Sequence, residues 1–201
     1  MQINFDVLSY AQENPLETIG TIFGLLCVYL NTRASVWGWV TGIVSVGAYV
    51  FVFWRANLYG DFILHIIYAM LSVYGLYHWL YGGKGVDNLP ITKSSLQELV
   101  FVLFLGALGT PILGYVFANY FANPYQPYWD AGIFSFSLVA QWQLAQKRIE
   151  NWLLWIGIDT VAVWLYFSKG LIFTGVLYLI FLGLATLGYF QWKKEIQINK
   201  L

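Results

Sequence analysis

Residues 149–167 read IENWLLWIGIDTVAVWLYF, an apolar run whose one charged residue away from the edge is Asp159. A helix that crosses a bilayer needs about 20 mainly apolar residues, and this run is close to that length. It must be helical, because each unpaired backbone group in lipid costs several kcal/mol. The whole chain is 59% hydrophobic and only 10% charged, whereas a soluble domain carries roughly 25% charged residues. The sequence therefore predicts an integral membrane protein whose surface is partly covered by lipid.

Six further apolar stretches are predicted to span the membrane as helices. Their continuous runs, such as 99–105, do not alternate between polar and apolar residues, which excludes a transmembrane β-barrel. Ser95 and Glu98 have the spacing of a capping box, so the fourth helix should start there. The seven predicted spans are 17–31, 36–54, 58–81, 99–118, 128–146, 149–167 and 171–192. The predicted fold is an all-α integral membrane protein with seven transmembrane helices in a single transmembrane domain, residues 1–201.

The positive charges predict how the chain is oriented. With seven spans, the loops on the side of the N-terminus carry only Arg55 and Lys169. The opposite side carries all the other basic residues: Arg33, Lys84, Lys93, Lys147, Arg148, Lys193, Lys194 and Lys200. Because the side richer in lysine and arginine faces the cytoplasm, we expect the N-terminus outside and the C-terminus in the cytoplasm. Residues 1–15 lack the basic segment of a cleavable signal peptide.

An internal duplication emerges when the chain is aligned with itself. Residues 17–79 align with 130–192 without a gap, and the paired landmarks of this repeat alignment are Glu17 with Asp130, Trp39 with Trp152, Gly75 with Gly188, and Trp79 with Trp192. Chance matching in so apolar a chain is the alternative. A duplication predicts two three-helix repeats, 17–81 and 128–192, in the same orientation on either side of a linker helix, 99–118. This parallel 3+1+3 arrangement is typical of transporters whose substrate site lies mid-membrane between the halves.

One face of the sixth predicted span carries a candidate binding site. Trp152, Trp155 and Asp159 are spaced i, i+3 and i+7, so they share a helical face. A carboxylate inside the membrane costs roughly 2.5–3.5 kcal/mol on insertion scales, so Asp159 should face a cavity or a cation. Two indole rings beside a carboxylate suit a flat, cationic aromatic ligand. Alternatively, both tryptophans anchor the helix at the interface and Asp159 pairs with a lysine or arginine. The first repeat keeps one indole at the matching positions, Trp39, which predicts a lopsided site.

Further polar side chains within the predicted spans are candidate substrate contacts: Ser45, His65, Gln141 and Asn151. His65 either lines the transport path as a hydrogen-bonding group or simply bonds a neighbouring helix. Asp61 lies four residues before His65, but no third ligand is near them in the sequence, so we expect no metal site. Serine in membrane helices often serves packing alone, so Ser45 is a weaker candidate.

Other classes of function lack their sequence signatures. The net charge is zero, which gives no reason to expect a nucleic-acid partner. The chain has no phosphate-binding loop, nucleophile elbow or His-Glu-x-x-His motif. We therefore expect a non-enzyme without a bound cofactor. Two alternatives stay open. A membrane enzyme acting on a lipid or quinone would need a polar cluster at an interface, and a structural membrane subunit would not need Asp159 at depth.

The run from Glu150 to Trp155, followed by Asp159, resembles the Trp-x-x-Trp-x-x-x-Asn/Asp motif of the PnuC family of vitamin transporters. Residues 57–59, 74–79 and 129–130 resemble that family too, and the likeness covers nearly the whole chain. It implies a homotrimer of seven-helix subunits in a bacterial inner membrane, with a fold similar to that of SWEET transporters. It also implies facilitated diffusion of nicotinamide riboside, which phosphorylation then traps inside the cell.

Two positions depart from the family pattern. The last motif position is often asparagine in nicotinamide riboside carriers and is Asp159 here, and a glutamine typical of the third span is replaced by His65. Related members called PnuT carry thiamine. Both vitamins are cationic heteroaromatics, so Asp159 fits either of them. The predicted substrate-binding residues are Trp39, Ser45, His65, Gln141, Asn151, Trp152, Trp155 and Asp159.

Overall fold

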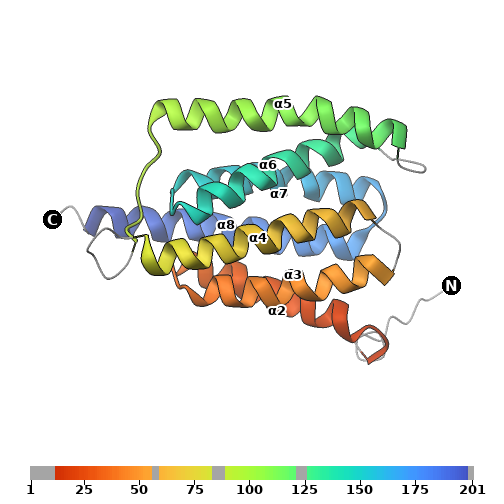
Figure 1. Cartoon of the computed structure of the whole chain (residues 1–201), viewed down its shortest axis with the longest axis horizontal. Coiled ribbons are helices and arrows are strands. Elements are labelled where there is room, and N and C mark those ends of the chain that lie inside the picture. The colour runs from red at the N-terminus through yellow and green to blue at the C-terminus, as the bar shows by residue number, and fades with distance from the viewer. Residues whose placement is uncertain (1–11, 56–58, 83–88, 121–125, 199–201) are drawn as a thin grey trace.

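The computed structural model of the chain describes residues 12–55, 59–82, 89–120 and 126–198. Seven long helices run up and down through these residues (Figure 1), so the all-helical prediction is confirmed. They are α2 (Pro15–Thr32), α3 (Trp37–Arg55), α4 (Tyr59–Tyr81), α5 (Leu96–Tyr120), α6 (Pro127–Ala145), α7 (Glu150–Ser168) and α8 (Ile172–Ile198). Each predicted span lies on one of these helices. Outside the described residues lie 1–11, Asn57, Leu58, Lys84 and Lys200, together with the side chain of Asp61.

Local sequence signals account for several helix ends. The Ser95 hydroxyl accepts a hydrogen bond from the backbone N–H of Glu98 (3.1 Å), which caps α5 where the sequence predicted its start. Pro15 and Pro127 lie in the first turns of α2 and α6, where a missing N–H breaks no helical hydrogen bond. After α7, Gly170 adopts a φ of +73°, a left-handed conformation that glycine takes without strain.

Six of the seven helices form a closed ring. Around it, α2 packs on α3, α3 on α4, α4 on α6, α6 on α7, α7 on α8, and α8 back on α2. The seventh helix, α5, packs on α6 outside the ring, and Figure 1 shows it along one side of the bundle. The ring therefore sets α2, α3 and α4 opposite α6, α7 and α8.

Four buried tryptophans fill one end of the ring, where α2, α4, α6 and α8 finish. We call this the indole end; its tryptophans are Trp39, Trp79, Trp152 and Trp192. Trp39 packs edge-on against Trp79 with ring centroids 5.5 Å apart and planes at 88°, and Trp152 packs against Trp192 with the same distance and angle. Trp79 and Trp192 also touch each other, with centroids 6.0 Å apart. The indole end is thus a packed aromatic layer across the whole ring.

Hydrogen bonds at the indole end recur at positions that the repeat alignment pairs. Trp79 Nε1 donates to the backbone carbonyl of Leu144 (3.2 Å), and Trp192 Nε1 donates to the backbone carbonyl of Asn31 (3.0 Å). The same carbonyl of Asn31 accepts the backbone N–H of Ala34, and that of Leu144 accepts the backbone N–H of Lys147. Ala34 and Lys147 have φ values of 51° and 54°, so the α2–α3 and α6–α7 turns share an uncommon backbone conformation.

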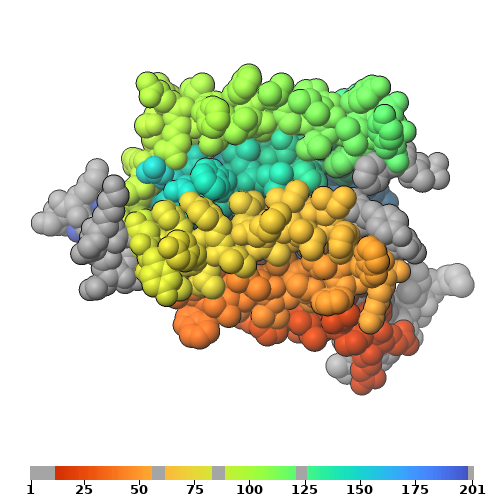
Figure 2. All heavy atoms as spheres, in the orientation of Figure 1, coloured from red at the N-terminus to blue at the C-terminus, as the bar shows by residue number. Residues whose placement is uncertain are grey.

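The outer surface is strongly apolar. Within the part of the chain that the structure describes, four helices are long and apolar enough to cross a membrane: Trp37–Arg55, Phe62–Tyr81, Leu96–Tyr120 and Ile172–Ile198. Figure 2 shows α6 recessed between α4 and α5, where these three helices line a mainly apolar groove of about 320 Å³. The other helices, α2, α6 and α7, carry most of the buried polar side chains, which lowers their hydropathy although they belong to the same bundle.

Candidate functional site

A cavity of about 230 Å³ lies inside the ring, and all six ring helices contribute to its wall. Its walls are mostly apolar, with a few converging polar groups, which is the usual character of a small-molecule site. The polar side chains in the wall are Asn31, Ser45, Tyr68, Ser72, Ser137, Gln141, Asp159 and Tyr178. Five of the eight predicted substrate-binding residues line this one cavity: Ser45, Gln141, Trp152, Trp155 and Asp159.

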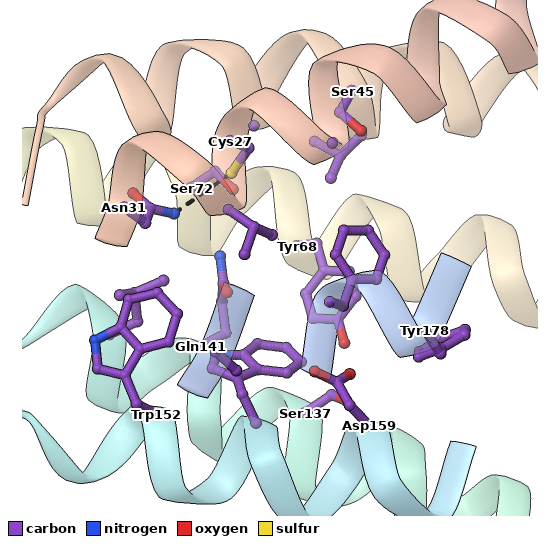
Figure 3. Close-up of a pocket in the computed structure, with 18 residues that line it drawn as sticks. Cys27, Asn31, Ser45, Tyr68, Ser72, Ser137, Gln141, Trp152, Asp159 and Tyr178 are labelled. Carbon is purple, nitrogen blue, oxygen red and sulfur yellow. Dashed lines mark hydrogen bonds between the residues drawn. The ribbon is translucent and has the colours of Figure 1, made fainter. Parts of the chain in front are cut away.

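Asp159 is the charged residue of the cavity wall. Its side chain comes from the middle of α7 and is 3% exposed. Figure 3 shows it beside Tyr68 and Ser137, at the opposite end of the cavity from Trp152. Within the described residues no lysine or arginine forms an ion pair with Asp159. The ion pairs there join other residues, Arg148 with Glu98 and Lys169 with Asp130.

Trp152 and Trp155 reach the cavity in different ways. One face of Trp152 lies directly against Gly188, where an added Cβ would be 2.6 Å from the ring, and its edge meets Trp192. The ring is only 1% exposed, so Trp152 borders the cavity and cannot be sandwiched by a ligand. Trp155 is less buried and also lines the cavity, so it offers the more accessible indole surface.

Ser45 and Gln141 both line the cavity but differ in whether their polar atoms already have a partner. The Ser45 hydroxyl donates to the backbone carbonyl of Gly20 (2.7 Å), which ties α3 to α2. Gln141 comes from α6 and lies between Trp152 and Asp159 in Figure 3, with its amide directed across the cavity. The side chain of Gln141 is therefore available to a ligand, whereas the hydroxyl of Ser45 already has a partner.

The cavity wall does not include Trp39, His65 or Asn151. The ring of Trp39 fills the space against Gly75, where an added Cβ would lie 2.5 Å away, so this indole packs behind the wall. His65 is held among aromatic rings, and its centroid is 5.9 Å from that of Tyr68, which does line the cavity. Asn151 is fully buried and donates from Nδ2 to the backbone carbonyl of Arg148 (2.5 Å).

Five polar residues of the wall were not among the predicted contacts: Asn31, Tyr68, Ser72, Ser137 and Tyr178. Asn31 lies at the end of the shortest predicted span, and its Nδ2 donates to the sulfur of Cys27 (3.4 Å), as Figure 3 shows. The same repeat alignment pairs Tyr68 with Phe181, and both rings line the cavity. The repeat alignment was therefore a signal for Tyr68, whereas no sequence pattern pointed to Asn31.

A family model described as nicotinamide mononucleotide transporter matches residues 14–194, which include α2 to α7 and most of α8. The chain belongs to this family. The family is that of the PnuC transporters, so the resemblance of the tryptophan motif is confirmed. Membership makes the chain a helical membrane transport protein.

Named relatives of the PnuC family cover most of this chain. The riboflavin/roseoflavin transporter RibM of Streptomyces davaonensis is 29% identical over 185 residues, which are 88% of this chain and 83% of that protein. The nicotinamide riboside transporter PnuC of Escherichia coli is 25% identical over 202 residues, covering 88% and 84%. A crystal structure of the vitamin B3 transporter PnuC superposes with a TM-score of 0.73 at 20% identity, covering 95% of this chain and 86% of the other. The superposition shows that this chain has the PnuC fold.

Proposed function

We propose that this chain carries nicotinamide riboside across the membrane by facilitated diffusion. The observation that supports this most directly is Asp159, a carboxylate that is 3% exposed in the cavity wall and that has no ion-pair partner among the described residues. A buried charge is costly unless an opposite charge or several hydrogen bonds compensate it. The positively charged pyridine ring of nicotinamide riboside would provide that compensation.

The shape of the wall fits a flat ring joined to a polar sugar. Trp155, Tyr68 and Phe181 offer aromatic surface near Asp159, which suits stacking and edge contacts with a cationic ring. Towards the indole end, Asn31 and Gln141 offer amide groups that can bond the hydroxyls of a ribose. We therefore place the charged ring beside Asp159 and the sugar towards Trp152.

Riboflavin is the second candidate, because the relative RibM is 29% identical and is named a riboflavin transporter. Two features of the cavity favour nicotinamide riboside. Riboflavin is uncharged and leaves Asp159 without a counter-charge, and its three fused rings need more room than one pyridine. The cavity of about 230 Å³ is small against the roughly 300–1,000 Å³ of typical ligand pockets. Thiamine shares the cationic aromatic character and remains the alternative within the same chemical class.

We further propose seven membrane spans in a parallel 3+1+3 arrangement, like that of SWEET transporters, with α5 as the linker. The indole contacts and both turns recur at positions paired by the repeat alignment, which supports two equivalent halves. The proposed setting is a bacterial inner membrane, with the indole end facing the cytoplasm and the subunits forming homotrimers. After entry, phosphorylation of nicotinamide riboside would keep it inside.

Transport into proteoliposomes tests the proposal. Purified protein reconstituted without any ion gradient should equilibrate radiolabelled nicotinamide riboside across the vesicle membrane. The degree to which an excess of unlabelled thiamine or riboflavin slows this uptake measures the selectivity of the transporter. Equilibration without accumulation is expected, because no energy-coupling motif is present in the sequence. Accumulation that occurs only when a proton or sodium gradient is imposed would contradict facilitated diffusion. Uptake of riboflavin alone would replace the proposed substrate.

A further inference from the structure

The two halves of the ring meet along two helix–helix contacts, which differ in the number of polar side-chain interactions across them. We call the contact of α4 with α6 the α4–α6 seam and the contact of α2 with α8 the α2–α8 seam. In the repeat alignment, α4 corresponds to α8 and α2 to α6, so the seams are equivalent positions of one pattern. Any difference between them therefore comes from side chains and not from the order of the helices.

Side-chain hydrogen bonds join α4 to the end of α6 near the indole end of the α4–α6 seam. Gln146 Nε2 donates to the Tyr74 hydroxyl (2.8 Å). At the indole end, Trp79 Nε1 donates to the Leu144 carbonyl. The ring of Tyr74 also stacks on Trp142, with planes 8° apart. Lys147, which is 6% exposed, covers the Trp79 ring at 4.5 Å and donates to the Leu89 carbonyl (2.7 Å).

The segment between α4 and α5 packs on the α6–α7 turn, beside the same seam. Residues 89–95, which we call the strap, lie against the α6–α7 turn, and α5 begins directly after them. Backbone bonds join Thr92 to Lys147 and Ile149, at 3.1 and 3.0 Å. The N–H of Ser94 donates to Glu150 (2.9 Å), and Arg148 pairs with Glu98 (3.1 Å). The strap is thus held on the second half at the indole end, where Lys147 bonds the Leu89 carbonyl and also covers the Trp79 ring of α4.

The equivalent positions of the α2–α8 seam lack these polar partners. Where the α4–α6 seam has Tyr68 and Ser137, this seam has Phe181 and Gly24, neither of which carries a hydroxyl. Tyr74 corresponds to Leu187, and Lys147 corresponds to Ala34. Between the described residues at the indole end, one hydrogen bond joins α2 to α8, from Trp192 Nε1 to the Asn31 carbonyl (3.0 Å).

We propose that the cavity opens at the indole end along the α2–α8 seam, with the Trp192–Asn31 bond as the latch and the α4–α6 seam as the fixed pivot. Opening the α4–α6 seam would break the Trp79–Leu144 and Gln146–Tyr74 hydrogen bonds and would separate Lys147 from the Trp79 ring. Opening the α2–α8 seam breaks one such bond at this end, so it is the easier of the two to part. The inference rests on the proposed transport role, which requires the cavity to open at this end.

The latch is in contact with the cavity. The side chain of Asn31 lines the cavity, and its backbone carbonyl accepts the latch bond from Trp192. Asn31 therefore connects the ligand site to the hydrogen bond that holds the α2–α8 seam closed. Trp152 also lines the cavity, and its ring edge packs on the ring of Trp192. A ligand that moves either side chain therefore acts directly on the latch.

The rate at which a methanethiosulfonate forms a mixed disulfide with Cys27, releasing methanesulfinate, measures opening, because Cys27 lines the cavity and is the chain's one cysteine. The matched variants are Trp192→Phe and Trp79→Phe, each of which keeps an aromatic ring and removes one indole N–H donor. In detergent, a charged methanethiosulfonate should modify Cys27 faster in Trp192→Phe by about threefold to tenfold, as expected for the loss of one buried hydrogen bond. Trp79→Phe should stay within about twofold of the wild type, because the other ties of its seam remain. Equal acceleration by both variants, or none by Trp192→Phe, would overturn the proposal.

If Trp192→Phe does not fold, hydrogen–deuterium exchange of the unmodified protein tests whether the α2–α8 seam opens more readily than the α4–α6 seam. Backbone amides around Asn31 and Trp192 should exchange faster than those around Leu144 and Trp79. The reverse order, or equal rates, would also overturn the proposal. Neither measurement uses a transported substrate, so a wrong substrate assignment would show in the proteoliposomes and leave both results unchanged.

Discussion

Two glycines allow Trp152 and Trp39 to be tested by the same perturbation. An added Cβ would lie 2.6 Å from the Trp152 ring at Gly188 and 2.5 Å from the Trp39 ring at Gly75. Ordinary contact starts at 3.4 Å, so each ring must retreat by about 0.8 Å or more in the alanine variant. Both rings are almost completely buried, and overpacking of this kind costs about 1–3 kcal/mol of folding stability.

The two variants should differ in ligand binding, because only Trp152 lines the cavity. Gly188→Ala and Gly75→Ala should both lower the melting temperature in scanning fluorimetry, by about 2–4 °C per kcal/mol lost. Gly188→Ala should also weaken nicotinamide riboside binding about tenfold in calorimetry, which is about 1.4 kcal/mol, whereas Gly75→Ala should bind nearly as the wild type does. Gly157→Ala is the control. Gly157 lies on the same helix as Trp152, and a methyl group added there would meet nothing within 4 Å. Equal losses of affinity in the Gly188 and Gly75 variants would refute the distinct role of Trp152.

Two further predictions concern charge. Burial lowers the pKa of Lys147 below its usual value, while nearby Glu195 raises it in part. Between that lowered pKa and about 10.4, the unfolded chain therefore binds more protons than the folded chain, and folding stability rises with pH. The melting temperature of the wild type should rise with pH through this window, and Lys147→Met should lack that rise. Parallel pH profiles of the two proteins would contradict this. A reporter that is active only in the cytoplasm should be active when fused after Leu201, because eight of the ten basic residues lie on that side of the predicted spans. A silent reporter would overturn the orientation.

The sequence predicted the helices well because membrane insertion leaves few other options. Every backbone group must be paired within its own helix, so apolar length alone places the spans. The predicted ends agree with the structure to within a few residues, except that α8 continues to Ile198. Its last turns carry Lys193 and Lys194, whose charges ended the apolar run without ending the helix.

The site was predictable where charge or spacing marked it. Asp159, Trp152 and Trp155 share a helical face in the sequence and share a cavity in the structure. The position of Trp39 depends on Gly75, which lets α4 approach so closely that the indole is enclosed behind the wall. Such an approach between helices leaves no mark in the spacing of either one. The contribution of Asn31 likewise depends on where α8 crosses the end of α2.

Calorimetry of the wild type and of Asp159→Asn with nicotinamide riboside tests the role of Asp159 most directly. The substitution keeps the size and most of the hydrogen bonding of the side chain and removes its charge. A cation about 4 Å from a carboxylate gains roughly 4 kcal/mol at an effective dielectric constant of about 20, so affinity should fall by at least about tenfold while the melting temperature is kept. Unchanged affinity in a folded Asp159→Asn variant would show that Asp159 does not balance the charge of the substrate.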